Sequence, residues 1–317
     1  MNKKDIKIVF MGTPEFSCVV LRAVVNEGYN VSLVVTQPDK PVGRKHVITP
    51  PDLKVCAEEL GIEVYQPNSM RTDEAFDAVS EQAPDLIITA AYGKILPERI
   101  LNIPRLGNIN VHASLLPKYR GASPVQSCLL NGDEITGVTI MNMDVGMDTG
   151  AMLSHEELKI TPNIHYDELM SELAEVGAKL LVETLPSYID GNIVPVPQND
   201  DEAVNCFPIT PDMGEFNWDF SAQKIHNIVR ALSTWPGAYV LNDGNKLKVY
   251  DTEVVEVFDE STLPFEVKNG MILKAHKSDL IIKCDNSYIN LKELQVPGGK
   301  RLKSSDCAHN FKVGTFI

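Results

Sequence analysis

The 317-residue sequence contains no apolar run of the ~20 residues that a membrane-spanning helix needs. Its six cysteines are scattered and none forms a Cys-x-x-Cys pair, so neither a zinc site nor a thiol redox motif is expected. Met1–Asp5 precede only a short apolar stretch, which indicates a strand rather than a signal peptide. With 44% hydrophobic and 23% charged residues, the chain is typical of a soluble, two-domain protein of the reducing cytoplasm.

Several common enzyme motifs are also missing. The sequence has no G-x-G-x-x-G, Walker A, H-E-x-x-H or G-x-S-x-G pattern. Gly12 follows the first expected strand, but Pro14 stands where the phosphate-binding turn belongs, which argues against a nicotinamide-dependent oxidoreductase. No serine or cysteine is placed as a nucleophile, so a covalent intermediate is not expected.

The net charge of −14 argues against nucleic-acid binding when it is taken over the whole chain. The charge is uneven, however. Residues 1–204 hold 16 Lys and Arg against 29 Asp and Glu, a net charge of −13. Residues 205–317 hold 13 against 14, a net charge of −1, and their basic residues gather late. A local basic face is therefore compatible with the acidic total.

Strands and helices alternate through the first two thirds of the chain. Apolar runs predict strands at 6–11, 31–36, 62–65, 85–91, 108–112 and 136–143, and periodic patterns predict helices at 15–27, 52–60, 71–82 and 122–131. This alternation predicts an α/β fold with a Rossmann-like, doubly wound, mostly parallel sheet. Residues 37–51, with four prolines, are expected to form a long polar loop.

The pattern changes after about residue 200. A helix is expected at 222–233, followed by β-rich runs at 238–242, 246–257, 271–275, 279–284 and 288–294. These short strands predict a small C-terminal β-barrel or sandwich. Residues 186–205, rich in Pro, Asn and Asp, are the expected linker, so we divide the chain into domains 1–204 and 205–317.

The most informative stretch is 107–121. Asn110 and His112 are two residues apart on an expected strand, so their side chains share one face near its carboxyl end. Ligands of open α/β sheets bind outside such strand ends, where an amide and an imidazole can polarise a carbonyl and transfer a proton. The alternative is a turn-forming asparagine and a structural histidine, and the spacing alone leaves both interpretations open.

Two acidic residues, Asp144 and Asp148, follow the expected strand 136–143. Their loop is expected to emerge at the same edge of the sheet as His112. One of the carboxylates would then orient the histidine or raise its pKa. The alternative is that both are ordinary surface or turn residues.

The run from Asn110 to Gly121, Asn-Val-His-Ala-Ser-Leu-Leu-Pro-Lys-Tyr-Arg-Gly, resembles the 10-formyltetrahydrofolate-dependent formyltransferases. So do Gly137-Val-Thr-Ile and the Asp148-Thr-Gly150 loop. Within that family, four stretches resemble the members that act on charged initiator tRNA: Phe10–Phe16, Thr36–Arg44, Arg230-Ala-Leu and Trp235–Tyr239. The resemblance covers nearly the whole chain.

The resemblance implies roles for individual residues. The implied catalytic residues are Asn110, His112 and Asp148. The implied folate contacts are Ala90, Ala91 and Tyr92 around the pterin, and Ser114, Leu115, Leu116 and Pro117 in the following loop. Loop 37–51 would bind the tRNA acceptor end through Arg44 and Lys45, which are otherwise solvated loop charges. The C-terminal domain would be an OB-like barrel that binds tRNA.

The implied reaction moves the formyl group of 10-formyltetrahydrofolate to the α-amino group of methionine on initiator tRNA and leaves tetrahydrofolate. We expect a monomer that uses no metal and contacts no membrane. The candidates for binding the tRNA backbone are basic residues of the C-terminal part: Lys274, Lys277, Lys283, Lys292, Lys300, Arg301 and Lys303. Any one of them is otherwise part of an ordinary solvated surface.

Two other functions stay open from the sequence. One is an enzyme of the same family that formylates a glycinamide ribonucleotide or a nucleotide sugar, and loop 37–51 argues against it. The other is a folate-binding module without turnover. The presence of Asn110, His112 and Asp148 argues against the second, because binding alone does not require them.

Overall fold

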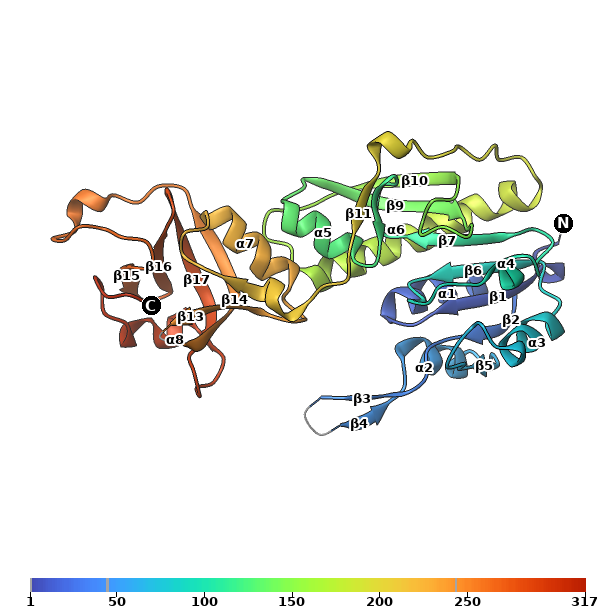
Figure 1. Cartoon of the computed structure of the whole chain (residues 1–317), viewed down its shortest axis with the longest axis horizontal. Helices are drawn as coiled ribbons and strands as arrows, with labels where there is room; N and C mark the ends of the chain where they lie inside the picture. The colour runs from blue at the N-terminus through green and yellow to red at the C-terminus, as the bar shows by residue number, and fades with distance from the viewer. Residues whose placement is uncertain (1, 44–45, 243) are drawn as a thin grey trace. The chain divides into compact units, whose positions relative to one another are not determined.

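The computed structural model describes residues 2–43, 46–242 and 244–317. Contacts divide the chain into two units, which Figure 1 shows in cartoon form. The first unit contains Met1–Pro124, Ile135–Lys159 and Met170–Phe207, and the second contains Val125–Glu134, Ile160–Leu169 and Pro208–Ile317. Two internal segments, 125–134 and 160–169, therefore group with the C-terminal part of the chain, which the sequence did not predict.

The first unit is built on a sheet whose central strands are parallel. In spatial order its strands are β10 (Met152–Lys159), β9 (Ile135–Asn142), β7 (Asn108–His112), β6 (Leu86–Ala90), β1 (Lys7–Gly12), β2 (Asn30–Val35) and β5 (Val64–Tyr65). The five from β7 to β5 run parallel, which confirms the predicted parallel-rich α/β sheet. β9 runs antiparallel to β7, and β10 antiparallel to β9. The strand expected at 136–143 is therefore confirmed, but it is antiparallel to β7, whereas a parallel strand was expected.

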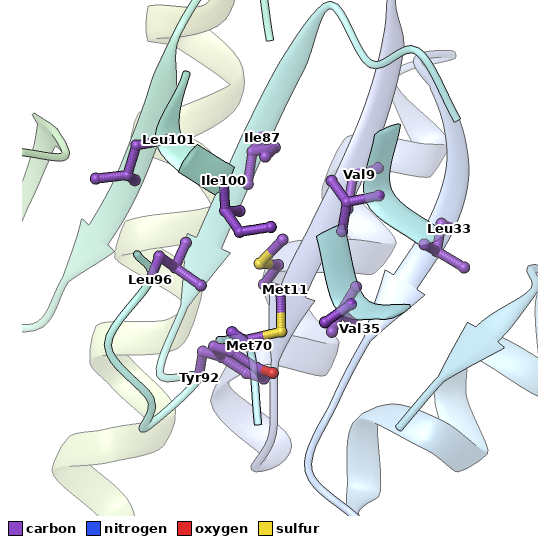
Figure 2. Close-up of a cluster of buried hydrophobic side chains, with 12 residues drawn as sticks. Val9, Met11, Leu33, Val35, Met70, Ile87, Tyr92, Leu96, Ile100 and Leu101 are labelled. Carbon is purple, nitrogen blue, oxygen red and sulfur yellow. The ribbon is translucent and has the colours of Figure 1, made fainter. Parts of the chain in front are cut away.

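Helices cover both faces of this sheet. α3 (Asp73–Glu81) and α4 (Glu98–Leu101) pack on the face of Val9, Met11 and Ile87, in the apolar cluster of Figure 2. On the other face, α1 (Glu15–Asn26) packs on β1 and β6, and α6 (Tyr166–Ile189) brings Gly177 against Val111 and Val138. α2 (Asp52–Glu59) packs on α1. Burying each such aliphatic side chain contributes about 1.5–3 kcal/mol.

The long helix α6 is missing from the sequence expectations, and so is β10. The apolar face of α6 recurs every three to four residues and is buried, at Leu169, Leu173, Leu181, Leu185 and Ile189. This packing keeps the helix intact through Pro186, which lies in its last turn. The expected linker at 186–205 was therefore wrong at its start. β10 was not predicted, because its Ser-His-Glu-Glu sequence is largely exposed and lacks the apolar pattern that is typical of a strand.

Four short strands form two further pairs in the first unit. β3 (Lys40–Val42) and β4 (Val47–Thr49) form an antiparallel hairpin, so 37–51 is not an irregular loop throughout. β8 (Lys118–Gly121) pairs in parallel with β11 (Val204–Cys206), which places the segment after α6 beside the run that follows His112.

The second unit contains a mostly antiparallel sheet with the strands in the order β12 (Glu215–Phe216), β13 (Ala238–Asn242), β14 (Asn245–Val255), β17 (Ser287–Gln295), β16 (Asp279–Cys284) and β15 (Ile272–His276), with β18 (Leu302–Lys303) also on β17. The predicted C-terminal strands are thus confirmed. Within the described residues, no pairing joins β12 to β15, so the strand ladder does not close into the expected barrel. The α-helices of the second unit include α5 (Pro124–Asn131), α7 (Ala222–Ala231) and α8 (Ser304–Cys307).

Helix α7 anchors the inserted segment 160–169 by buried polar side chains. The Nε2–H of His226 and the guanidinium of Arg230 both donate to the carbonyl oxygen of Pro162, at 3.0 and 3.2 Å. Thr252 Oγ1 lies 2.9 Å from the other ring nitrogen of His226, and burial lowers the pKa of this histidine. The family-like Arg230-Ala-Leu stretch therefore has a structural role within the second unit.

Short 3₁₀ helices lie at Lys3–Asp5, Asp200–Glu202, Pro211–Gly214, Glu260–Thr262 and Ala308–Asn310. Over the described part of the chain, none of the helices combines the length and the apolar character that a membrane crossing requires.

The Gly137-Val-Thr-Ile stretch has a glycine because β10 passes very close to β9. A Cβ atom on Gly137 would lie 2.1 Å from the carbonyl oxygen of Glu156 and 2.6 Å from Cδ2 of Leu115. The carbonyl oxygen belongs to the paired backbone of β10, so it cannot move aside without disturbing the sheet.

We therefore expect Gly137→Ala to lower the free energy of unfolding by about 1–3 kcal/mol, as overpacked core sites do. Urea denaturation followed by circular dichroism measures the change. Ile135→Ala is the control, because Ile135 is 51% exposed on the same strand. It should change the stability by less than about 0.5 kcal/mol. A Gly137→Ala protein as stable as the control would contradict this close approach.

Candidate functional site

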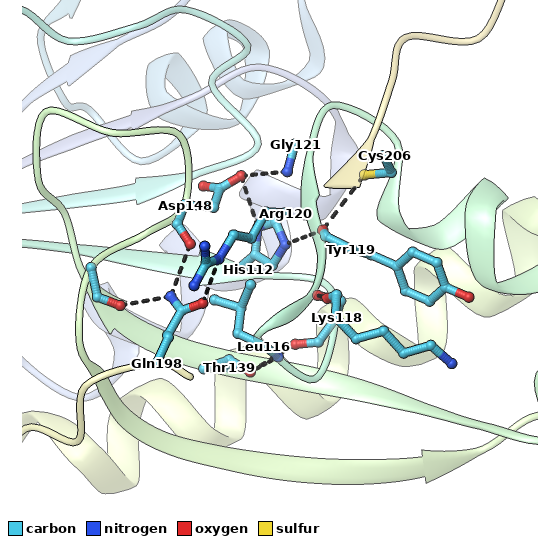
Figure 3. Close-up of polar contacts among 12 residues, drawn as sticks. His112, Leu116, Lys118, Tyr119, Arg120, Gly121, Thr139, Asp148, Gln198 and Cys206 are labelled. Atoms are coloured by element: carbon cyan, nitrogen blue, oxygen red, sulfur yellow. Dashed lines mark hydrogen bonds and ion pairs between the residues drawn. The ribbon is translucent and has the colours of Figure 1, made fainter. Parts of the chain in front are cut away.

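His112 ends β7 with its ring buried and fixed on both sides (Figure 3). Its Nε2 lies 3.0 Å from the carbonyl oxygen of Tyr119. A carbonyl oxygen can only accept, so the hydrogen bond assigns a proton to Nε2. The other nitrogen, Nδ1, lies 3.7 Å from Oδ2 of Asp148. The ring nitrogen of His112 that this hydrogen bond leaves unused therefore faces a carboxylate.

Asp148 reaches His112 by a route that the sequence analysis did not foresee. Because β9 is antiparallel to β7, its loop does not simply leave at the carboxyl edge of the parallel strands. Instead the loop folds back, and the backbone N–H of Gly121 donates to Oδ2 of Asp148 at 2.9 Å. Asp144 is a turn residue: its Oδ1 accepts from Gly146 N and Thr149 Oγ1, at 3.0 and 2.7 Å.

Asn110 presents a carboxamide that is free to bind a ligand. Asn110 is 9% exposed, and its side chain has no hydrogen-bond partner within the described part of the chain. Thr89 pairs with it across β6 and β7, and the buried hydroxyl of Thr89 is likewise unpartnered among the described residues. Buried polar groups are nearly always hydrogen-bonded, so the unpartnered hydroxyl of Thr89 beside the amide of Asn110 marks a place for a polar ligand atom.

The loop after His112 is held by its own hydrogen bonds and by Thr139. The fully buried Ser114 donates to the carbonyl oxygen of Lys118 at 2.6 Å. Thr139 lies opposite His112 in β9; its hydroxyl donates to Ser114 O at 2.7 Å and accepts from Leu116 N at 3.1 Å. In the sequence, Thr139 is only part of a family-like stretch, and its position there indicates no role.

The predicted pterin-contacting residues differ in exposure. Ala90 is buried at the end of β6, and Ala91 is exposed with φ = 47°, in the left-handed region. The ring of Tyr92 points into the core cluster of Figure 2, and burial raises the pKa of its hydroxyl. Its carbonyl oxygen accepts from Thr13 Oγ1 and Gln37 Nε2, at 3.0 and 2.9 Å. Two of the family-like stretches thus position this loop.

The predicted tRNA contacts Arg44 and Lys45 lie outside the described residues. The hairpin that flanks them is described, and its apolar side chains are unusually open to solvent. Val42, Val47 and Ile48 are 55%, 59% and 62% exposed.

The second unit holds another titratable pair. His165 Nε2 lies 3.5 Å from Asp251 Oδ1, and this contact raises the pKa of His165 and lowers that of Asp251. The pair lines a polar cavity together with Tyr250 and Arg301. None of the residues that the resemblance marks as catalytic lines this cavity. Over the described residues, no group of three or more His, Cys, Asp or Glu side chains is arranged to hold a metal ion.

Comparisons with known proteins agree over both units. A family model described as "Formyl transferase" matches residues 6–185, and one described as "Formyl transferase, C-terminal domain" matches 208–312. Proteins named methionyl-tRNA formyltransferase are similar over nearly the full length. The one from Macrococcus caseolyticus is 46% identical over 299 residues, covering 94% of each chain. That from Caldicellulosiruptor saccharolyticus is 43% identical over 308 residues, covering 96% of this chain and 97% of the relative.

Two solved structures share the fold at low sequence identity. HypX of Aquifex aeolicus, in complex with tetrahydrofolic acid, matches with a TM-score of 0.64 and 15% identity over 94% of this chain, which spans only 46% of HypX. An N-formyltransferase of Helicobacter canadensis, in complex with folinic acid and dTDP-3-aminofucose, matches with a TM-score of 0.67 and 17% identity, covering 90% of this chain and 98% of that one.

Proposed function

The chain belongs to the formyl transferase family, and from this we propose that it moves the formyl group of 10-formyltetrahydrofolate to the α-amino group of methionine on initiator tRNA. Relatives named methionyl-tRNA formyltransferase, 40–46% identical over nearly the whole chain, support this acceptor. The observation that carries the chemistry is the buried His112, with one nitrogen facing Asp148 and the free amide of Asn110 two residues before it.

We propose that the folate lies against the loops 90–92 and 114–117. The unpartnered polar groups of Thr89 and Asn110 support a ligand at this place. The hydroxyl of Ser114 is already bonded inside its loop, so Leu115, Leu116 and Pro117 would supply apolar contacts rather than hydrogen bonds.

In the proposed reaction, the α-amine nitrogen bonds to the formyl carbon, and the bond from that carbon to N10 breaks. The amine loses a proton and N10 gains one. The amine is a ready nucleophile, because an α-amino group has a pKa of ~8 in peptides and esterification lowers it. The Asn110 amide donates to the formyl oxygen as it gains negative charge. Nε2 of His112 keeps its proton in the hydrogen bond to Tyr119, so the ring enters the step with a second proton on Nδ1 and gives that proton to N10. Asp148 takes up the amine proton through water and returns it to Nδ1, which restores both groups.

We expect Asn110→Ala and His112→Ala each to lower kcat at least about 100-fold, because an oxyanion donor contributes ~10²–10³ and an acid–base group ~10²–10⁴. Single-turnover formyl transfer to charged initiator tRNA measures this, with glycinamide ribonucleotide as the competing acceptor. His155→Ala is the control, since His155 is exposed on β10. Near-wild-type turnover in either variant would remove that residue from the mechanism, and formylation of the small acceptor alone would overturn the tRNA assignment.

The tRNA acceptor end is proposed to bind the β3–β4 hairpin through Arg44 and Lys45. The exposed aliphatic side chains of the hairpin support a macromolecular partner, because apolar groups so open to solvent commonly mark interaction sites.

Arg44→Ala should therefore lower kcat/KM for charged tRNA while the Kd for folate stays unchanged, because the guanidinium pairs with phosphate or stacks on a base. Steady-state kinetics with tRNA varied, and folate binding by calorimetry, separate the two effects. Arg71→Ala, which removes an exposed arginine without an assigned role, is the control. An unchanged kcat/KM for tRNA in Arg44→Ala would refute the assignment.

The basic residues of the second unit are not equally available to RNA. Lys274, Lys283, Lys292 and Arg301 form ion pairs with Asp279, Glu260, Glu253 and Glu293. Among the described residues, Lys277, Lys300 and Lys303 have no ion-pair partner, and all three are exposed. We propose these three as the contacts to the tRNA backbone.

Replacing Lys277, Lys300 and Lys303 together by Ala should weaken tRNA binding and flatten its salt dependence. Each lost phosphate contact removes roughly 0.7–0.9 from the slope of log K against log salt. Filter binding from low to high salt gives the slope, and Lys292→Ala is the paired-lysine control. If the triple substitution leaves the slope unchanged, these three lysines do not contact the tRNA backbone.

The remaining parts of the proposal come from the family resemblance. We propose that residues 1–204 carry the formyl transfer and 205–317 the OB-like, tRNA-binding part, and that the enzyme acts in the cytoplasm as a monomer. Light scattering that returns the mass of one chain, 35.0 kDa, would agree with the monomer, and twice that mass would contradict it.

A further inference from the structure

The loop that carries Asp148 is bonded internally by Asp144, whose Oδ1 accepts from Gly146 N and Thr149 Oγ1, and neither bond contacts the backbone of Asp148. Residues 144–147 are exposed, and Asp148 itself has φ = 55°, in the left-handed region that is unfavourable for a residue with a Cβ atom. Such a conformation persists only where the surrounding structure holds it. The hydrogen bond from Gly121 fixes one carboxylate oxygen but leaves the backbone of the loop to be held by something else.

Gln198 supplies that hold. Its Nε2 donates to the carbonyl oxygens of Asp148 and Gly150, at 2.8 and 2.7 Å, and so spans the residue between them (Figure 3). Its Oε1 accepts from Nε of Arg120 at 2.8 Å. The orientation of the amide is unambiguous, because carbonyl oxygens only accept and a guanidinium only donates.

Arg120 ties this amide to the strand that contacts the rest of the site. It is 7% exposed, and its Nη2 donates to Asp200 at 2.9 Å. In β8, Tyr119 accepts from His112, Arg120 bonds Gln198, and Gly121 donates to Asp148. Three consecutive residues of one strand therefore contact the imidazole, the amide that holds the loop, and the carboxylate.

We propose that Gln198 is a positioning residue, which sets the distance between the Asp148 carboxylate and Nδ1 of His112 and touches neither substrate. The inference rests on the proposed function, because it gives Gln198 a part in the reaction of that site. It goes beyond that function because it assigns a role to a residue about fifty positions from Asp148 along the chain, which holds the Asp148 loop in place.

Two substitutions in the full-length chain test the proposal. Gln198→Met keeps the length and volume of the side chain but removes its donors, and Gln198→Glu replaces the donors by acceptors that face two carbonyl oxygens. Asn199→Ala is the matched control, since Asn199 is exposed and, among the described residues, its side chain bonds only to Asp201 and Glu202. The measurements are kcat, KM for each substrate, the pH profile of kcat, and hydrogen exchange over residues 143–151.

Both Gln198 variants should lower kcat roughly 10- to 100-fold, as misplacement of a reacting group by about 1 Å does, with each KM within about threefold of wild type. The pH profile of kcat should be displaced, because Asp148 no longer lies at its set distance from His112. Loop 143–151 should exchange faster. A residue that only stabilised the fold would reduce the amount of active enzyme and leave the profile of the remainder in place.

The inference is overturned if either well-folded Gln198 variant keeps the wild-type kcat and pH profile. Asp148→Asn separates the two levels of the proposal, because asparagine tolerates the left-handed region but lacks the charge. If Asp148→Asn loses activity while the Gln198 variants do not, only the positioning role fails. If the wild-type enzyme transfers no formyl group, the proposed function fails. In that case hydrogen exchange over residues 143–151 still tests Gln198. An exchange rate that Gln198→Met leaves unchanged would show that Gln198 does not hold the loop.

Discussion

The hydrogen bond from His112 to the carbonyl oxygen of Tyr119 is the constraint on which the site depends. It fixes the tautomer of the ring and turns the remaining nitrogen toward Asp148. A backbone carbonyl is a precise partner only if its own strand is held, and β8 is held by its pairing with β11. The orientation of the His112 ring thus depends on a two-stranded ribbon outside the main sheet.

The reversal of β9 explains why this ribbon is needed. In a fully parallel sheet, crossover connections bring successive loops to the same edge. Here the antiparallel β9 is joined to β10 by the loop 143–151, with no crossover helix. This loop has to fold back before Asp148 can approach His112. Side-chain to backbone bonds from distant segments replace the ordering that a crossover helix gives.

Sequence patterns predicted the elements whose signals are local. β1, β6, β7 and α7 were placed correctly because apolar runs and helical periodicity are encoded within each segment. The direction of β9 was not predicted, since an apolar run is the same for a parallel and an antiparallel strand. Spacing made Asn110 and His112 candidates, whereas the choice of Asp148 over Asp144 came from the family resemblance. No sequence pattern marked Gln198 as part of the site, because it bonds to backbone carbonyls about fifty residues away and a backbone partner leaves no residue type to recognise.

The hydrogen bonds of α7 show why the order of residues along a chain and the energetic division of a fold need not coincide. His226 and Arg230 are 2% and 3% exposed, and both donate to Pro162, in a segment that lies between β10 and α6 along the chain. A C-terminal fragment that begins near residue 205 lacks these acceptors. Arg230 would keep its hydrogen bond to Asn227 Oδ1 but lose the carbonyl oxygens of Thr161 and Pro162, and a buried guanidinium with unsatisfied N–H groups is destabilising. The second unit therefore needs residues 160–169 to complete its own polar interior, although they precede it by some forty positions.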